Sequence, residues 1–178
     1  MTGRAPDGVP ETGRPPRLWG FVVDGIAALG TLLIVGLMLI ICADIVARNL
    51  FGGSLPLVSE LGALLVVLIV ALQLAATIRA DRLARTMAFL APLEEKRPRA
   101  AALLRAAYEL TGAAVVGGMA WATVSVLGKD WASGEFIGTP GLGTMPTWPF
   151  RALILLGLAV AAAEFLRRAV AVLRGATR

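Results

Sequence analysis

Four long apolar stretches, separated by shorter polar segments, dominate the pattern of hydrophobic and polar positions along the chain. Each is close to the length that crosses roughly 30 Å of hydrocarbon at about 1.5 Å per helical residue. Three of them contain no charged residue, and the fourth is interrupted by Arg151 and Glu164. The stretches cover residues 25–43, 61–78, 110–128 and 147–166. This pattern predicts an all-α membrane protein with four transmembrane helices.

We expect a single membrane domain over residues 18–170, with helices that extend somewhat beyond the apolar stretches. The expected spans cover about residues 21–47, 57–79, 102–128 and 147–167. Arg151 and Glu164 lie near the ends of the fourth span, where long side chains reach the headgroups at lower cost than at the bilayer centre. Residues 1–17 contain prolines and no apolar core, so they predict a flexible tail and no cleaved signal peptide. Residues 171–178 form the second expected tail.

Composition supports the membrane assignment. Hydrophobic residues make up 57% of the chain and charged residues 16%, and the mean hydropathy is +0.78. A soluble domain of 178 residues could not bury so much apolar surface. A bilayer is therefore the expected solvent for most of the chain.

The distribution of Lys and Arg predicts the orientation in the membrane, because short cytoplasmic segments retain positive charge. The basic residues gather in the head, the second connecting segment and the tail: Arg4, Arg14, Arg17; Arg79, Arg82, Arg85, Lys96, Arg97, Arg99, Arg105; Arg167, Arg168, Arg174, Arg178. The other two connecting segments contain only Arg48, Lys129 and Arg151. Both chain ends are thus expected in the cytoplasm. The net charge of +5 then indicates contact with anionic membrane lipid and no nucleic-acid binding.

Several kinds of chemistry lack their residues. The chain contains no His, which removes the usual membrane haem ligand and proton shuttle, and this argues against a redox anchor subunit. Cys42 is the only cysteine, so it can form neither an intrachain disulfide nor a metal cluster. No glycine-rich phosphate loop precedes a helix. We predict no enzyme activity, no cofactor and no metal site.

The connection between the first two spans carries the most informative polar residues. Asp44 and Arg48 are four residues apart with the acid first, the favoured order for a helical ion pair. Ser59 and Glu60 stand at the expected start of the second helix, where a carboxylate meets the positive end of the helix dipole. One interpretation is an ionic cluster of Asp44, Arg48 and Glu60 that fixes this turn. The alternative is that these residues only mark helix ends.

The remaining connections also carry candidate elements. Residues 81–91 have Leu83, Met87 and Leu90 at helical spacing, which predicts a short amphipathic helix in the cytoplasmic interface; a docking helix for a partner is the alternative. Glycines at positions 112, 117 and 118 permit close helix approach in the third span. Trp131 and Trp148 flank a Gly- and Pro-rich turn and are expected at the outer interface.

The apolar stretches offer few polar groups that could form a transport pathway. Gln73 is the only strongly polar residue in the second stretch, and the third has only small hydroxyl side chains. Ionisable residues inside the membrane usually mark substrate or ion sites. The pattern therefore favours a scaffold. The main rival is a self-contained oligomeric four-helix transporter that would use Asp44 or Glu60 as its coupling carboxylate, although both lie close to the expected outer surface.

The order of these motifs resembles the small membrane subunit, the Q or DctQ-like small permease, of tripartite ATP-independent periplasmic (TRAP) transporters. The first connection matches the family pattern at Asp44, Arg48, Phe51, Ser54, Leu55, Pro56 and Glu60. After the second span the family often has an Arg and a His-containing segment; this chain has Arg79, Asp81, Arg82 and Leu83, without the His. The Gly-x-x-Pro-x-Trp turn before the fourth span is matched by Gly143, Pro146 and Trp148.

The resemblance implies a function that the residues alone do not give. It implies a non-catalytic subunit that braces a large, elevator-type membrane subunit (M) in the bacterial inner membrane. The system would take up a small organic-acid solute by symport with a cation, Na⁺ being the expected one. A periplasmic binding protein (P) would deliver the solute. The missing His bears only on the contact that the second connection would make.

Overall fold

The fold is almost entirely helical. The computed structural model describes residues 17–53, 55, 57–80, 98–139 and 143–176. Its elements are α1 (Arg17–Phe51), α2 (Val58–Arg79), α4 (Pro98–Ser133), β1 (Phe136–Thr139), β2 (Gly143–Pro146) and α5 (Trp148–Ala176). All four helices are long and apolar enough to cross a membrane, so this prediction is confirmed. Residues 1–16 of the expected tail (1–17) and the whole of the expected interfacial helix, residues 81–91, lie outside the described residues.

The structure differs from the all-α prediction in one element, a short β-hairpin. β1 and β2 pair antiparallel, with Phe136 opposite Pro146 and Ile137 opposite Met145. The hairpin lies between α4 and α5, in the segment that the sequence predicts to be a turn. Neither strand alternates apolar and polar residues, since their sequences are FIGT and GTMP, and both contain glycine, which is uncommon in strands. α5 also continues to Ala176, beyond the expected end of the fourth span.

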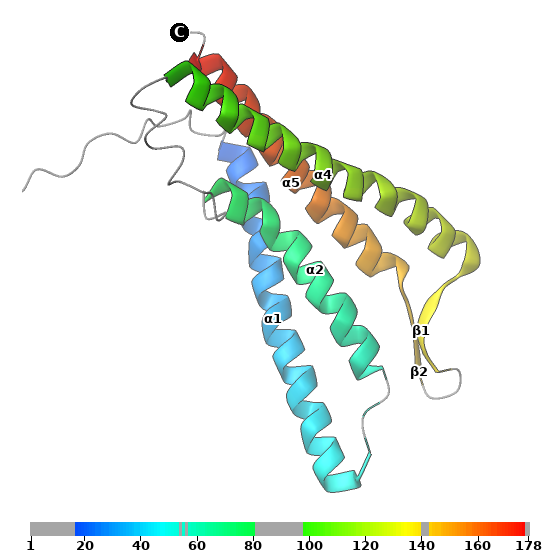
Figure 1. The fold of residues 1–178 in the computed structure, drawn as a ribbon. Coiled ribbons are helices and arrows are strands. Elements are labelled where there is room, and N and C mark those ends of the chain that lie inside the picture. Colours follow the sequence, from blue (N-terminus) through cyan, green and yellow to red (C-terminus); the bar gives the residue numbers. More distant parts are fainter. Residues whose placement is uncertain (1–16, 54, 56, 81–97, 140–142, 177–178) are drawn as a thin grey trace, which may run out of the picture.

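The helices form two antiparallel pairs, α1 with α2 and α4 with α5 (Figure 1). α2 and α5 pack against each other, so they lie in the middle while α1 and α4 lie on the outside. The two pairs lie close together where α2 and α5 end, and they spread apart toward the β-hairpin (Figure 1). We call the first region the termini end, comprising the starts of α1 and α4 and the ends of α2 and α5. The opposite region, with the β-hairpin, is the hairpin end.

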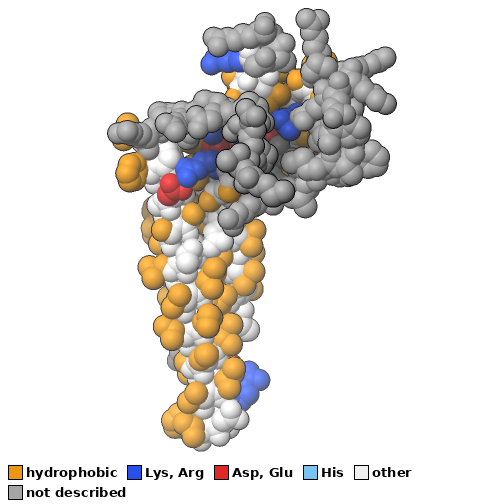
Figure 2. All heavy atoms as spheres, turned by 90° about the vertical axis from the view of Figure 1, so that its left-hand side faces the viewer, with side chains coloured by type: hydrophobic (Ala, Val, Ile, Leu, Met, Phe, Trp, Pro, Cys, Tyr) orange, Lys and Arg blue, Asp and Glu red, His pale blue; other side chains and the backbone are white. Residues whose placement is uncertain are grey.

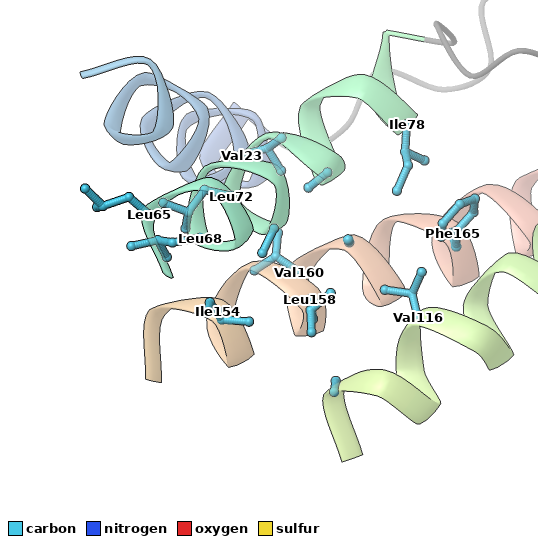
Figure 3. Close-up of a cluster of buried hydrophobic side chains, with 14 residues drawn as sticks. Val23, Leu65, Leu68, Leu72, Ile78, Val116, Ile154, Leu158, Val160 and Phe165 are labelled. Atoms are coloured by element: carbon cyan, nitrogen blue, oxygen red, sulfur yellow. The ribbon is translucent and has the colours of Figure 1, made fainter. Parts of the chain in front are cut away.

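The apolar core lies along the contact between α2 and α5 (Figure 3). Its largest buried apolar side chains include Leu68, Leu72 and Ile78 of α2, and they pack with Leu158 and Phe165 of α5. Lipid tails are as apolar as these side chains, so close packing rather than removal from water favours such contacts in a membrane. The core therefore depends on how closely the helix backbones approach.

Glycines allow two of these close approaches. A Cβ atom added at Gly157 of α5 would lie 2.6 Å from the carbonyl oxygen of Ala71 in α2. A Cβ atom at Gly112 of α4 would lie 2.8 Å from the Phe165 ring of α5. Small residues permit this geometry in membrane helices. The sequence indicates Gly112 as a packing residue, but it gives no such indication for Gly157.

α1 has the most exposed apolar surface. Leu32, Leu39 and Phe21 are all exposed, as are many other large apolar side chains along this helix. Figure 2 shows hydrophobic side chains over the length of the helical column, with charged side chains toward its two ends. Contiguous apolar surface of this size requires a cover of lipid or of another membrane protein. α1 is therefore the face through which the chain meets its surroundings.

Candidate functional site

At the termini end, the buried carboxylate of Glu164 joins α5 to α1. Its Oε2 accepts a hydrogen bond of 2.7 Å from Nε1 of Trp19, 145 residues away in the sequence. Its Oε1 lies 2.5 Å from Nη2 of Arg167. The side chain has no exposed surface, so the expectation that it extends to the headgroups is wrong. A buried carboxylate is tolerated because a cation and hydrogen-bond donors surround it.

Arg79, a predicted site residue, joins the end of α2 to the start of α1. Its Nη1 donates a hydrogen bond of 3.1 Å to the carbonyl oxygen of Gly20, and its Nη2 forms an ion pair with Asp24. The sequence gives no reason to connect these residues, because Asp24 lies 55 positions earlier. The guanidinium group suits this role because it can serve several acceptors at once.

Arg168 brings three helices together at the same end. Its Nε lies 3.3 Å from Oε1 of Glu109 in α4, and its Nη1 donates to the carbonyl oxygen of Ile78 in α2. Glu109 is only 2% exposed. Sequence reasoning missed this acid because it borders the uncharged third stretch, where it looks like the end of a span.

At the hairpin end, Asp44 fixes the connection between α1 and α2. Its Oδ2 lies 3.1 Å from Nη2 of Arg48, the pair that the spacing predicts. Its Oδ1 accepts a hydrogen bond of 2.8 Å from the backbone N–H of Leu55. Two residues later, Leu57 has a φ of 71°, a left-handed conformation that costs an L-residue about 1–2 kcal/mol. The buried Asp44 carboxylate therefore holds the returning chain next to a strained position.

Glu60 has a different partner from the one the sequence suggests. Its Oε2 accepts a hydrogen bond of 2.6 Å from the backbone N–H of Gly138 in β1. Asp44 and Arg48 pair with each other, and Glu60 holds the β-hairpin instead, so the three charges form two separate contacts. Ser59 is exposed on the first turn of α2. The hairpin contact could not be foreseen because the two residues lie 78 positions apart.

The base of the β-hairpin is bonded to α4 and α5. Oδ2 of the buried Asp130 lies 2.5 Å from Nε of Arg151 and accepts a hydrogen bond of 2.9 Å from the Thr147 hydroxyl. The Thr147 backbone N–H also donates to the carbonyl oxygen of Glu135, at 3.2 Å. Arg151 is thus paired within the protein, and its side chain also remains 31% exposed.

The remaining predicted site residues lie beside this base. Pro146 ends β2, opposite Phe136. Trp148 begins α5, and its ring meets that of Trp131 edge to face, with centroids 5.2 Å apart and planes at 76°. Both rings remain partly exposed, as a position at the membrane interface requires.

Within the part of the chain that the structure describes, the charged groups form contacts between elements and no recognisable catalytic centre. Among the described residues, no three or more His, Cys, Asp or Glu side chains are placed to hold a metal ion. Each carboxylate described above has a contact that joins its helix to another helix, to a connection or to the hairpin, and for Asp44 and Glu164 this contact is a hydrogen bond because their ion pairs lie within one helix. Fold and contacts together define a multi-pass membrane protein whose charged groups serve its own architecture.

The comparison with protein families gives the particular class. The family model described as "Tripartite ATP-independent periplasmic transporters, DctQ component" matches residues 37–175. The chain therefore belongs to this family and is a small permease subunit of a TRAP transporter, as the order of its motifs indicates. No curated protein and no solved structure matches the chain. The family is one component of a tripartite system, which implies a large membrane subunit and a periplasmic binding protein as partners.

Proposed function

We propose that this subunit braces the large membrane subunit while that subunit carries solute across the bacterial inner membrane. The transported solute is a small organic acid, taken up together with a cation, Na⁺, after delivery by the periplasmic binding protein. Both chain ends face the cytoplasm, as the concentration of Lys and Arg at the termini end favours. The family of the chain supports the proposal, because its members are components of tripartite transporters.

The observation that carries the bracing role is the contrast between the middle of the bundle and its ends. Buried acids with hydrogen-bond or ion-pair partners occur at the termini end, as with Glu164, and at the hairpin end, as with Asp130. Between them, α2 and α5 pack through apolar side chains. A fixed apolar bundle with an exposed apolar helix, α1, suits a static partner in a membrane complex.

The geometry argues against the rival, a self-contained oligomeric transporter. In that mechanism Asp44 or Glu60 would bind the coupling cation near the centre of the membrane. Asp44 instead holds the Leu55 amide and Arg48, and Glu60 holds the Gly138 amide, both at the hairpin end. Neither carboxylate lies in the apolar middle of the bundle.

Reconstitution in liposomes tests the proposal. The purified small subunit alone should give no sodium-driven solute uptake. Liposomes that contain the small and large subunits, supplied with the binding protein, should take up the solute. Omitting the small subunit should lower that uptake, and the two membrane subunits should co-purify in mild detergent at moderate salt. Coupled uptake by the small subunit alone, or full activity without it, would refute the bracing role.

A further inference from the structure

The β-hairpin is held firmly at its base. Thr147, which follows β2, is buried and bonds through its hydroxyl to Asp130 of α4. The Glu135 N–H, just before β1, donates to the carbonyl oxygen of Asp130 at 3.1 Å. Arg151 of α5 adds its charge to the same aspartate. These contacts connect both ends of the hairpin to the α4–α5 pair.

The body of the hairpin is held to the other helix pair by a different kind of contact. Gly138, in the middle of β1, donates its N–H to Glu60 of α2 at 2.6 Å. An amide that donates to α2 points away from β2, so Glu60 occupies the place that a third strand would take. Gly138 has a φ of 103°, a backbone conformation that glycine adopts readily and residues with a Cβ atom rarely do. This conformation lets its amide face the carboxylate. Glu60 is exposed, so water can compete for both groups.

We propose that Glu60 and the Gly138 amide form a releasable latch between α2 and the β-hairpin. In the closed state, described above, the carboxylate holds the hairpin against the start of α2. In the open state the hairpin turns about its base at Asp130 and Thr147 and leaves α2, while the termini end keeps its contacts. The latch depends on an oxygen acceptor at position 60 and does not require a negative charge there.

The difference in burial between the exposed Glu60 of the latch and the carboxylates of the termini end explains why release would stay local. The carboxylates of Glu164 and Glu109 at the termini end are buried, and breaking their contacts leaves charges without water. Breaking the latch exposes both of its groups to solvent, which costs much less. Among these contacts, opening of the latch is therefore the movement of lower energy, while the buried Asp130 keeps the base of the hairpin in place.

Amide hydrogen exchange and spin-label distances in the full chain, in lipid nanodiscs, test the latch. Glu60→Ala should raise the exchange rate of the Gly138 amide about tenfold, because its acceptor is lost. Labels at Val66→Cys and Thr144→Cys, in a Cys42→Ser background, should show a broader and longer distance between α2 and the hairpin. Positions 42, 66 and 144 are all exposed, so these substitutions and labels do not disturb the buried core.

Two controls separate the latch from a general loosening of the bundle. Glu60→Gln keeps a carbonyl oxygen, so its Gly138 exchange should stay within about twofold of wild type. Labels at Val22→Cys and Leu166→Cys report on the termini end and should give the same distance in all three proteins. Unchanged Gly138 exchange in Glu60→Ala, exchange in Glu60→Gln as fast as in Glu60→Ala, or an equal change at the termini end would each overturn the proposal.

Discussion

The two ends of the bundle use carboxylates in different ways. At the termini end, Glu164 and Glu109 are buried and pair with arginine side chains. Glu109 pairs with Arg168 of another helix, and Glu164 pairs with Arg167 of its own helix and accepts a hydrogen bond from Trp19 of α1. At the hairpin end, Asp44 and Glu60 accept hydrogen bonds from backbone amides and connect a turn or a strand to a helix. Asp130 is an exception at the hairpin end, since it is buried, pairs with Arg151 and accepts a hydrogen bond from the Thr147 hydroxyl.

This difference determines whether a contact stabilises the packing of the whole bundle or only one connection. A buried acid whose arginine partner lies in the bundle stabilises the packing of whole helices, because its removal leaves an uncompensated charge. A carboxylate that accepts a loop amide stabilises only the conformation of that loop. Substitutions of Glu164 or Glu109 should therefore change the stability of the bundle, and those of Asp44 or Glu60 should act mainly on the connection or hairpin that they hold.

The largest effect is expected for Glu164→Leu. The change removes the acceptor of Trp19 and the partner of Arg167, and we expect it to lower the free energy of unfolding by about 3 kcal/mol. Steric-trapping measurements in bicelles would give this value. The matched control is Ala163→Leu, because the neighbouring position is exposed on the same helix. Equal losses in the two variants would remove the distinction between the ends.

An intermediate effect is expected where α2 and α5 cross. Gly157→Ala would place a methyl group 2.6 Å from the Ala71 carbonyl oxygen and force the two helices apart, at a cost of about 1–3 kcal/mol in unfolding free energy. Gly118→Ala, with open space around it, should be neutral or should stabilise α4 by up to about 1 kcal/mol. The same unfolding assay compares them. A stable Gly157→Ala protein would show that this crossing does not limit packing.

The smallest effects are expected at the first connection. Asp44→Ala removes the acceptor of the Leu55 amide and should cost about 1–2 kcal/mol of unfolding free energy. Arg48→Ala removes only an ion pair whose arginine side chain is 65% exposed, and it should cost about 0–1 kcal/mol. If both variants lose the same stability, the ion pair rather than the amide contact is what fixes the turn.

The sequence predicts features that depend on neighbours along the chain. The four helices follow from apolar length, and the Asp44–Arg48 pair follows from a spacing of four. The partner of Glu60 lies 78 positions away and the Trp19 partner of Glu164 lies 145 positions away, and no local pattern connects such residues. For this reason the sequence alone places Glu60 beside Asp44 and Arg48, and Glu164 at the membrane surface, whereas their partners are Gly138 and Trp19.

The hairpin and the helix crossing were missed for another physical reason. The segment around Gly143 and Pro146 contains residues that favour turns, and neither of its strands alternates apolar and polar residues. Gly157 is a single glycine in an apolar helix, and the sequence does not reveal that Ala71 of another helix lies against it. Both features depend on which elements meet in space.

The spacing of the charged residues along α1 indicates the hydrocarbon thickness of the membrane that suits this chain. Asp24, paired with Arg79, and Asp44, paired with Arg48, are separated along the helix by roughly 30 Å, the thickness of a typical hydrocarbon layer. A much thicker bilayer would draw these pairs into hydrocarbon, and a thinner one would tilt the helix. The last turns of α1, residues 45–51, lie outside the segment between Asp24 and Asp44, and they carry exposed apolar side chains. We therefore expect this helix end to lie among the lipid headgroups. A mismatch between the apolar length of α1 and the hydrocarbon thickness would then limit which membranes accommodate the chain.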